Sequence, residues 1–246
     1  MEVEFKDADL FKRIMDTVGG LMADVSLDFT NTGFSIKAMS PDNVAMIMVE
    51  GTKDLFGSFN VDKDTKLSVS LDDLNNILKL LKKEDKLRLT DSKNRLNLDI
   101  SGKNKMHFVI PLIDENYTAQ KVPQLKFSAE VTMLSALIKE AIKAGFLVDD
   151  SLYVTIDGQR VILSARSEEK EFSEDLSIND NKEIFNIHSD VITRSKYSIE
   201  HLTKFLNSLD ADKPVKLSLS NSYPLRLDYE INANAKMSFI LANRIE

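Results

Sequence analysis

The second half of this chain repeats the first half. Three pairs of segments carry the repeat: 24–33 with 149–158, 70–74 with 198–202, and 96–99 with 225–228. Matched residues are 125 apart in the first pair, 128 in the second and 129 in the third, as short loop insertions would produce. A solenoid repeat has a period of roughly 20–50 residues, so this period is too long for one. The sequence therefore predicts two copies of a whole domain.

The composition allows two domains of ordinary size. The chain has 246 residues, 43% of them apolar, so each half can bury a core of its own. The absence of cysteine removes disulfides, thiolate nucleophiles and cysteine-ligated metals. No apolar run approaches the roughly 20 residues of a membrane-spanning helix, and residues 1–5 alternate like a strand instead of a signal peptide. The net charge of −7 argues against binding DNA through overall charge.

Hydrophobic periodicity predicts two helices and several strands in each half. Helices are expected at 5–21, with Asp7 or Asp9 as the capping acid, and at 71–83, 133–144 and 199–209. Expected strands in the first half are 25–30, 34–39, 44–50, 66–69, 86–90, 95–100 and 106–112. Those in the second half are 152–156, 161–165, 171–178, 184–188, 215–220, 225–231 and 237–241. This pattern favours an α+β fold, in which each domain has antiparallel sheet with its two helices on one face.

The rhythm of helices and strands breaks once, between residues 113 and 126. This segment contains proline and several polar residues and has no sustained periodicity. It is the expected interdomain connector. We therefore predict an N-terminal domain at 1–112 and a C-terminal domain at 127–246.

The sequence offers no convincing active site. His107, His188 and His201 lie far apart and lack the spacing of metal ligands. Gly19 and Gly20 follow a helical pattern and have no phosphate-loop motif around them, so they are expected to end a helix.

Two acidic pairs leave one enzymatic alternative open. Residues 72–73 begin a predicted helix, where acids stabilise the N-terminal dipole, and residues 149–150 precede a predicted strand. We expect a structural role for both pairs. The alternative is a two-domain metal-dependent hydrolase that uses a carboxylate cluster at Asp149 and Asp150.

Positive charge is concentrated on the predicted helices. From residue 8 onward these helices carry eight basic and six acidic residues, a balance of +2, which leaves −9 on the rest of the chain. Acids gather near helix starts and bases in later turns, so complementarity to the helix dipoles explains the pattern on a solvated face. The alternative is a surface tiled by helices that presents mild positive charge to a polyanion. The duplication would place four such helices side by side.

Several segments match one known family along essentially the whole chain. The strongest are 34–44 (FSIKAMSPDNV), 77–79 (ILK), 109–114 (VIPLID) and the ending 239–246 (FILANRIE). Together with the duplication, they make the chain resemble proliferating cell nuclear antigen, the sliding clamp of DNA replication, and most closely its archaeal versions.

The resemblance implies the DNA clamp fold, in which three two-domain subunits form a closed ring with helices lining the hole. It implies a DNA polymerase processivity factor for replication and repair, with no catalytic residues, cofactor, metal or membrane contact. DNA polymerase, flap endonuclease and DNA ligase would bind through short interaction motifs, and a clamp loader would open the ring. An archaeal origin would place the protein in the cytoplasm with the nucleoid. Both a homotrimer and a heterotrimer with paralogous subunits remain open.

A ring also accounts for the distribution of charge. DNA that is held topologically needs only weak, salt-screened contacts to its phosphates. By resemblance, the cations that face DNA are Lys12, Arg13, Lys79, Lys82, Lys83, Lys139, Lys143 and Lys204.

Ring closure is expected through two edge strands, one at 105–111 and one at 170–178 of a neighbouring subunit. An unpaired edge exposes backbone donors and acceptors, and pairing satisfies both edges. The expected interface residues, with Lys82 opposite Glu140, are Lys82, Lys105, Phe108, Val109, Glu140, Phe172 and Leu176.

The resemblance further implies a pocket for a partner motif that contains a glutamine with apolar and aromatic anchors. Its expected residues are Met39, Val44, Met46, Val122, Pro123, Pro224, Ile240, Leu241, Ala242 and Ile245. Without the resemblance, Met39, Val44 and Met46 would be read as core residues. Asn243 stands where the family usually has proline, and Gln120 replaces a common apolar residue. We therefore expect a less rigid C-terminal tail.

Overall fold

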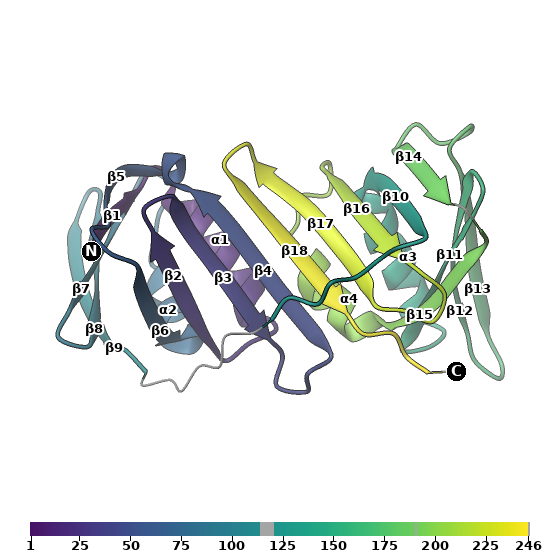
Figure 1. The fold of residues 1–246 in the computed structure, drawn as a ribbon, viewed down its shortest axis with the longest axis horizontal. Helices are drawn as coiled ribbons and strands as arrows, with labels where there is room; N and C mark the ends of the chain where they lie inside the picture. Colours follow the sequence, from purple (N-terminus) through teal and green to yellow (C-terminus); the bar gives the residue numbers. More distant parts are fainter. Residues whose placement is uncertain (114–120, 190, 246) are drawn as a thin grey trace. The chain divides into compact units, whose positions relative to one another are not determined.

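The computed structural model describes residues 1–113, 121–189 and 191–245. These residues divide into two compact units, whose α-helices and strands are labelled in Figure 1. The first unit comprises the described residues of Met1–Pro41, Ile47–Gln120 and Ile231–Met237. The second comprises those of Asp42–Met46, Lys121–Glu230 and Ser238–Glu246. Of the expected connector, 114–120 lies outside the described residues, and the domain boundaries drawn from the sequence stay a prediction.

The first half of the chain contains two α-helices and a short 3-10 helix, η1, among its strands. In chain order its elements are β1 (Glu2–Phe5), α1 (Ala8–Gly19), β2 (Asp24–Thr30), β3 (Gly33–Met39), β4 (Ala45–Thr52), η1 (Lys53–Leu55), β5 (Phe56–Asn60), β6 (Thr65–Ser70), α2 (Leu71–Leu78), β7 (Lys86–Ser92), β8 (Arg95–Ser101) and β9 (Lys105–Pro111).

The second half has the same order of α-helices and strands. Its elements are β10 (Ala129–Leu134), α3 (Ser135–Phe146), β11 (Ser151–Asp157), β12 (Arg160–Arg166), β13 (Glu171–Ser177), β14 (Ile184–Ser189), β15 (Thr193–Ser198), α4 (Ile199–Leu206), β16 (Pro214–Leu219), β17 (Leu225–Asn232) and β18 (Ala235–Leu241).

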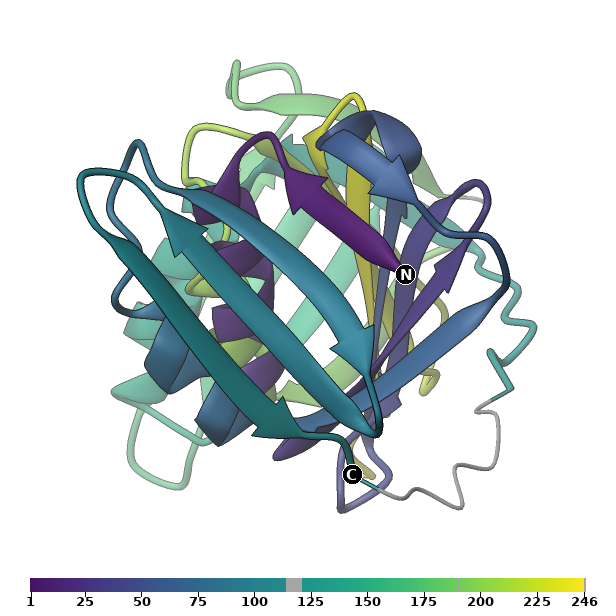
Figure 2. The ribbon, with the colours of Figure 1, turned by 90° about the vertical axis from the view of Figure 1, so that its left-hand side faces the viewer.

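Strand pairing confirms the duplication. The order β5-β1-β7-β8-β9 in the first half matches β14-β10-β16-β17-β18 in the second. The order β4-β3-β2-β6 likewise matches β13-β12-β11-β15. Every pairing whose register is described is antiparallel. The α+β fold expected from the sequence is therefore confirmed, and Figure 2 faces the sheet in which β9 forms one edge.

One detail of the sequence alignment was wrong. The matching hairpins pair Thr30 with Gly33 and Asp157 with Arg160, so equivalent positions are 127 residues apart at this point. The alignment of 24–33 with 149–158 used a spacing of 125, which is two residues out of register. A shift of two keeps each side chain on the same face of a strand, so the misaligned residues still match in the face that they occupy.

Local sequence explains how α1 begins and ends. Asp7 is the N-cap, and its side chain accepts a hydrogen bond of 3.1 Å from the Leu10 N–H. Phe5 lies in β1 instead of the helix, and its ring stacks on that of Phe11 with centroids 4.3 Å apart. The helix ends at Gly19 with Gly20 as its C-cap, which confirms that these glycines form a helix end.

The second predicted helix is shorter than expected. Helix α2 ends at Leu78, and Lys79 is its C-cap. Beyond it, Asp85 accepts a hydrogen bond from the Lys82 N–H at 3.0 Å, so its side chain stabilises a turn in place of another helical turn. Lys82 and Lys83 therefore lie in a turn, which corrects their placement on the helix.

Three strands were missed in the sequence. Strand β5 is short and contains a glycine, and β10 was assigned in part to the following helix, which begins at Ser135 instead of residue 133. Strand β15 buries Thr193, Ser195 and Tyr197 on its inward face. Two of these residues are small and polar, so the strand shows no alternation of apolar and polar residues.

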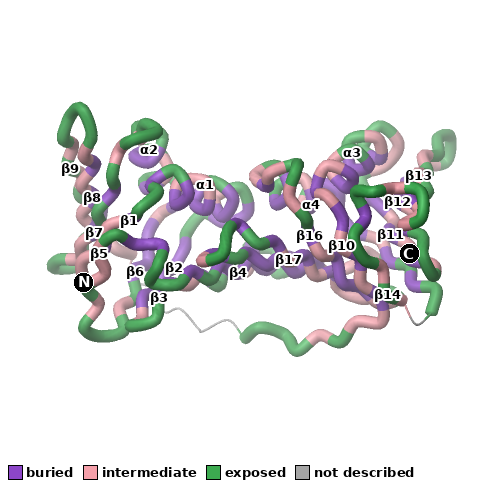
Figure 3. The backbone as a smooth tube through the Cα atoms, turned by 90° about the horizontal axis from the view of Figure 1, so that it is seen from above, coloured by how far each residue is buried: buried purple, intermediate pink, exposed green. Residues whose placement is uncertain are grey.

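Helices pack in pairs, α1 with α2 and α3 with α4. Figure 3 shows each pair on one side of the strands of its own unit. In the second unit, residues 121–126 run along the opposite side of the strands (Figure 3). None of the described helices is long and apolar enough to cross a membrane.

Candidate functional site

Positive charge on the helices is partly neutralised by nearby groups. Arg13 lies 3.6 Å from Asp9 through its Nε, and Lys204 lies 2.7 Å from Glu200. The Nζ of Lys79 donates to the Asn76 side chain at 3.1 Å. The helical surface therefore presents cations whose local field is weakened by their own helices.

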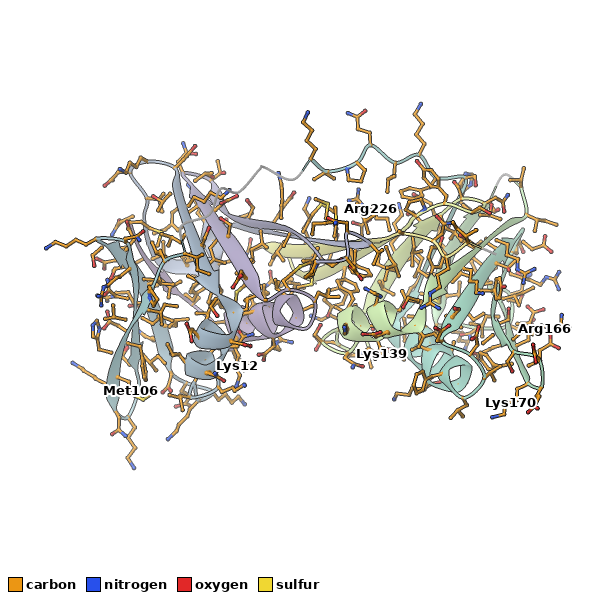
Figure 4. All side chains as sticks on the ribbon, turned by 90° about the horizontal axis from the view of Figure 1, so that it is seen from below. Lys12, Met106, Lys139, Arg166, Lys170 and Arg226 are labelled. Atoms are coloured by element: carbon orange, nitrogen blue, oxygen red, sulfur yellow. The ribbon has the colours of Figure 1, made fainter. Side chains whose placement is uncertain are left out.

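The lysines of α3 differ in their surroundings. Lys139, labelled in Figure 4, donates from Nζ to the Leu209 carbonyl oxygen and is half-buried. Burial lowers its pKa, the charge of Asp210 acts in the opposite direction, and the charge of Lys143 lowers it further. Lys143 is exposed, as are Lys79, Lys82, Lys83 and Lys204, whereas Lys12 and Arg13 are half-buried. Of the two lysines on α3, Lys143 is thus the more available to an external anion.

An apolar hollow lies between α3 and α4. Its lining residues are Lys139, Ile142, Lys143, Phe146, Thr203, Leu206 and Asn207. Phe146 and the adjacent Leu147 are strongly exposed at the end of α3.

Strands β9 and β13 are edge strands of their sheets. On β9, Phe108 is half-buried and Val109 is 40% exposed, while Lys105 is exposed. On β13, Phe172 is half-buried and Leu176 is buried. The sequence had placed both segments at free edges, and the sheet order gives them that position.

The backbone of β9 alternates between its paired and its free side. The Leu112 N–H donates to the Asn94 carbonyl oxygen at 3.1 Å, and in the same register Phe108 faces Leu98 and Val109 faces Asn97. In an antiparallel ladder, hydrogen-bonded and non-hydrogen-bonded pairs alternate. The backbone N–H of Phe108 therefore points to β8, and that of Val109 points to the free edge.

The two edges carry opposite charge. Residues 103–111 contain Lys103 and Lys105 and no acid. Strand β13 contains Glu171, Glu174 and Asp175, although Asp175 lies 3.3 Å from Arg160 of β12 and Lys170 precedes the strand.

Two acidic side chains repel each other beside the β13 edge. The pKa of Glu174 is raised, first by burial and then by the charge of Glu140. A cation placed close to Glu174 and Glu140 would therefore be bound favourably.

The ten expected pocket residues differ in exposure. Met46, Ile240 and Leu241 are buried, and Met46 is only 1% exposed. Met39, Val44, Pro224 and Ala242 are half-buried, and Val122, Pro123 and Ile245 are exposed. Met39 belongs to the first unit and the other nine to the second unit. Gln120 lies outside the described residues.

Backbone hydrogen bonds fix the C-terminal tail, residues 242–245, within the second unit. The Ala242 N–H donates to the Val44 carbonyl oxygen at 2.8 Å, and the Arg244 N–H donates to the Lys196 carbonyl oxygen at 2.7 Å. Val44 is itself positioned by Asp42, whose Oδ1 accepts from the Val44 N–H at 3.3 Å.

Sequence reasoning missed a histidine contact beside this segment. His201 lies 3.1 Å from Asp42 through Nε2 and 3.1 Å from the Ser198 hydroxyl through Nδ1. These contacts connect the start of α4, where Ser198 is the N-cap, to Asp42. Because Ser198 is buried, its hydroxyl is inaccessible. Asp42 and His201 are 159 positions apart, and no local motif could have paired them.

The carboxylates at the proposed hydrolytic site are engaged otherwise. Asp150 binds the guanidinium of Arg244, whose hydrogen bond, followed by that of Ser151, lowers the pKa of the carboxyl to about 2. Asp149 accepts the backbone N–H of Asp150. Among the residues that the structure describes, no group of three or more histidine, aspartate or glutamate side chains could hold a metal. The hydrolase hypothesis therefore has no support.

A duplicated α+β unit with paired helices on one side, and free edges of opposite charge, defines the DNA-clamp class of fold. Residues 1–114 match the family model for the N-terminal domain of proliferating cell nuclear antigen. The chain is 30% identical over 246 residues to the DNA polymerase sliding clamp of Thermococcus gammatolerans, covering 100% of this chain and 98% of the relative. The chain belongs to the DNA polymerase sliding clamp family.

Solved structures share the fold over the full length. Proliferating cell nuclear antigen from Thermococcus kodakaraensis superposes with a TM-score of 0.94 at 24% identity, covering 99% of both chains. The A. fulgidus protein, solved with the C-terminal region of FEN-1 bound, gives a TM-score of 0.89 at 24% identity and covers 100% of this chain and 98% of that one.

Proposed function

We propose that this protein is a DNA polymerase processivity factor whose copies close a trimeric ring around duplex DNA. The observation that carries the proposal is the equivalence of two strand pairs. The free edges β9 and β13 have β18 and β4 as their counterparts in the repeat. Hydrogen bonds join β4 and β18 at both of their ends. In the first unit the Thr52 N–H donates to the Asn234 carbonyl oxygen at 2.9 Å, and in the second unit the Ala242 N–H donates to the Val44 carbonyl oxygen. Pairing β9 of one copy with β13 of the next would therefore repeat, between subunits, the pairing that β18 and β4 make within one chain.

Charge supports this choice of partner edge. A basic β9 region facing an acidic β13 is favourable, whereas pairing β9 with another β9 sets like charges opposite each other. Lys82 of a neighbour beside Glu140 would relieve the repulsion between Glu140 and Glu174. Exposed ion pairs contribute only about 0–1 kcal/mol, so main-chain bonds and burial of Phe108 and Val109 supply most of the affinity. The remaining interface residues, Lys105, Phe172 and Leu176, lie on the same two strands.

We assign the DNA contacts to the cations on the helical side. Partial neutralisation by neighbouring acids suits a clamp, because strong phosphate contacts would impede sliding. The contacts carry no sequence information, since they are made to the backbone of DNA. The proposed set remains Lys12, Arg13, Lys79, Lys82, Lys83, Lys139, Lys143 and Lys204.

Partner proteins are assigned to the surface around the tail. Val44, Val122, Pro123 and Ile245 retain exposed area that a peptide would cover, while buried Met46, Ile240 and Leu241 would form the floor. DNA polymerase, flap endonuclease and DNA ligase are the proposed partners, each through a short motif with a glutamine and apolar and aromatic anchors. Such a pocket draws its affinity from a few buried anchors.

Catalysis is left to those partners. We propose that the protein has no nuclease, ATPase or polymerase activity and that an ATP-driven loader opens the ring. The proposed location is with DNA in the archaeal cytoplasm. Hydrolysis of ATP or DNA by the purified protein, at a rate abolished by Asp149→Asn, would restore the enzymatic alternative.

The mass of the protein in solution tests the ring. One chain has a mass of 27.8 kDa, so three copies have about 83 kDa. Light scattering at micromolar concentration should give the trimer, for the chain alone or when mixed with paralogous subunits from the same organism. A monomer under both conditions would refute the proposal.

A further inference from the structure

The tail presents one bonded side and one free side. Ala242 and Arg244 are two positions apart, and their N–H groups donate to the carbonyl oxygens of Val44 and Lys196. Backbone donors alternate in this way along an extended strand. Among the described residues, the backbone groups of Asn243 and Ile245 have no hydrogen-bond partner. Ile245 is 92% exposed. An extended segment with a free side of this kind can accept another extended chain by main-chain pairing.

A side chain fixes the far end of this tail. The Nη1 of Arg244 donates to Oδ1 of Asp150 and to the hydroxyl of Ser151, the latter at 2.8 Å. The Ser151 hydroxyl also donates to Oδ1 of Asp150 at 2.8 Å, so the three groups form a closed set. They join the tail to residues that are more than 90 positions earlier in the chain.

The anchor point itself is rigidly held. Ser151 begins β11 and is buried, and the carbonyl oxygen of Asp150 accepts the N–H of Ile199, the first residue of α4. Asp150 therefore lies where a sheet strand and a helix are tied together. An ion pair to this point restricts the tail far more than an ion pair to a loop would.

We propose that the Arg244–Asp150 ion pair is a positioning device for partner binding, which holds the tail as a preformed edge for the partner's peptide. This inference rests on the proposed function, because it concerns the same pocket. An extended segment with few backbone hydrogen bonds is poorly ordered unless it is tied down, and ordering it on binding reduces affinity. Asn243 supplies none of the backbone restriction that proline would give at that position. Arg244 provides the restraint by another route.

The anchor can be removed from either end. We would measure, by fluorescence anisotropy, the affinity of a labelled synthetic peptide with one glutamine, one aliphatic and two aromatic anchors. Arg244→Gln and Asp150→Asn should each weaken binding by about threefold to fivefold at low salt, where fivefold corresponds to about 1 kcal/mol. The exchanged pair, Asp150→Arg with Arg244→Asp, should recover most of the loss. Arg166→Gln, at an exposed arginine of β12 labelled in Figure 4, is the matched control and should bind as the wild type does.

Two further readouts separate positioning from general stability. Hydrogen exchange at the amides of Ala242 and Arg244 should accelerate in both single variants, while the mass in solution stays unchanged and the melting temperature falls by no more than about 2–4 °C. High salt should reduce the wild-type affinity to that of the variants, because the side chain of Asp150 is 67% exposed and the ion pair is screened.

The outcomes distinguish this proposal from the function on which it rests. If the wild type binds the peptide and both single variants bind it equally well, the anchor has no positioning role. If a trimeric wild type fails to bind the peptide at all, the partner pocket is wrong, and the role of the anchor falls with it.

Discussion

Replacing Val109 with proline tests ring closure at a single backbone atom. The N–H of Val109 points to the free edge of β9, so Val109→Pro removes a donor that β8 does not use. A neighbouring strand would then lose one hydrogen bond and keep a desolvated carbonyl without a partner, which costs about 1–3 kcal/mol. The proline ring also hinders the approach of a strand to the spacing of about 4.8 Å.

The expected effect on assembly is large. A combined penalty of about 2–4 kcal/mol per interface raises its dissociation constant by roughly 30- to 800-fold, at 1.4 kcal/mol for each factor of ten. Light scattering over a dilution series should show trimers of Val109→Pro breaking into monomers at concentrations where the wild type remains assembled. Val109→Thr keeps the N–H and a β-branched shape, so this matched control should stay trimeric.

A neighbouring position separates assembly from folding. The N–H of Phe108 points to β8, so Phe108→Pro should break the ladder inside the subunit and lower its free energy of unfolding by about 3 kcal/mol. Calorimetry at a concentration where both proteins are monomeric should find Val109→Pro close to the wild type and Phe108→Pro clearly less stable. A Val109→Pro protein that remains a trimer throughout the dilution series would refute pairing through β9.

Three other predictions address the DNA, the pocket and the tail. Replacing three helix-side cations with alanine should weaken loading onto DNA at low salt and reduce the salt dependence of binding by up to about three units of slope, while the ring stays assembled; the three are Lys12, Arg13 and Lys79. Normal loading by this triple variant would show that the helices do not face DNA. Met46→Asp places an unpaired charge at a site that is 1% exposed and should unfold or strongly destabilise the protein. At half-buried Val44, Val44→Asp should retain the melting temperature and weaken peptide binding. Unchanged peptide affinity in Val44→Asp would place the partners elsewhere. The pKa of Asp150 is lowered to about 2, against about 3.9 in an unfolded chain. The ion pair with Arg244 should therefore persist above pH 4 and be lost as the pH falls through 2, which NMR of the arginine side chain can follow. Loss of the ion pair near pH 5 would contradict this.

Periodicity predicted most elements because burial of one face is a local requirement. The spacing of Leu10, Phe11, Ile14 and Val18 predicts one apolar face of α1, and all four side chains are buried. Strand β15 was not predicted because its inward side chains include Thr193 and Ser195, which are polar and are buried only by neighbouring elements. Helix α2 was predicted too long because the side chain of Asp85 turns the backbone, a preference that apolar spacing does not record.

The candidate site was predictable where it depends on resemblance or on the order of strands. The sequence indicated the edges β9 and β13, and the sheet order gives both strands a free side. For the pocket, sequence could not separate residues that support the floor from residues on the surface. Met46 and Val44 are two positions apart in the chain, yet one is buried and the other half-buried.

The sequence by itself determined the duplication, the α+β class and the family, because repeats and hydrophobic periods are properties of residues near one another or at one fixed spacing. Tertiary structure decided which distant side chains meet. Arg244 forms an ion pair with Asp150, which is 94 positions earlier in the chain, and His201 contacts Asp42, which is 159 positions earlier. Such pairs are set by how strands and helices pack, since an ion pair needs its atoms within about 4 Å and no local pattern encodes that distance. The carboxylate that the sequence offered as a metal ligand is, in the folded protein, the anchor of the C-terminal tail.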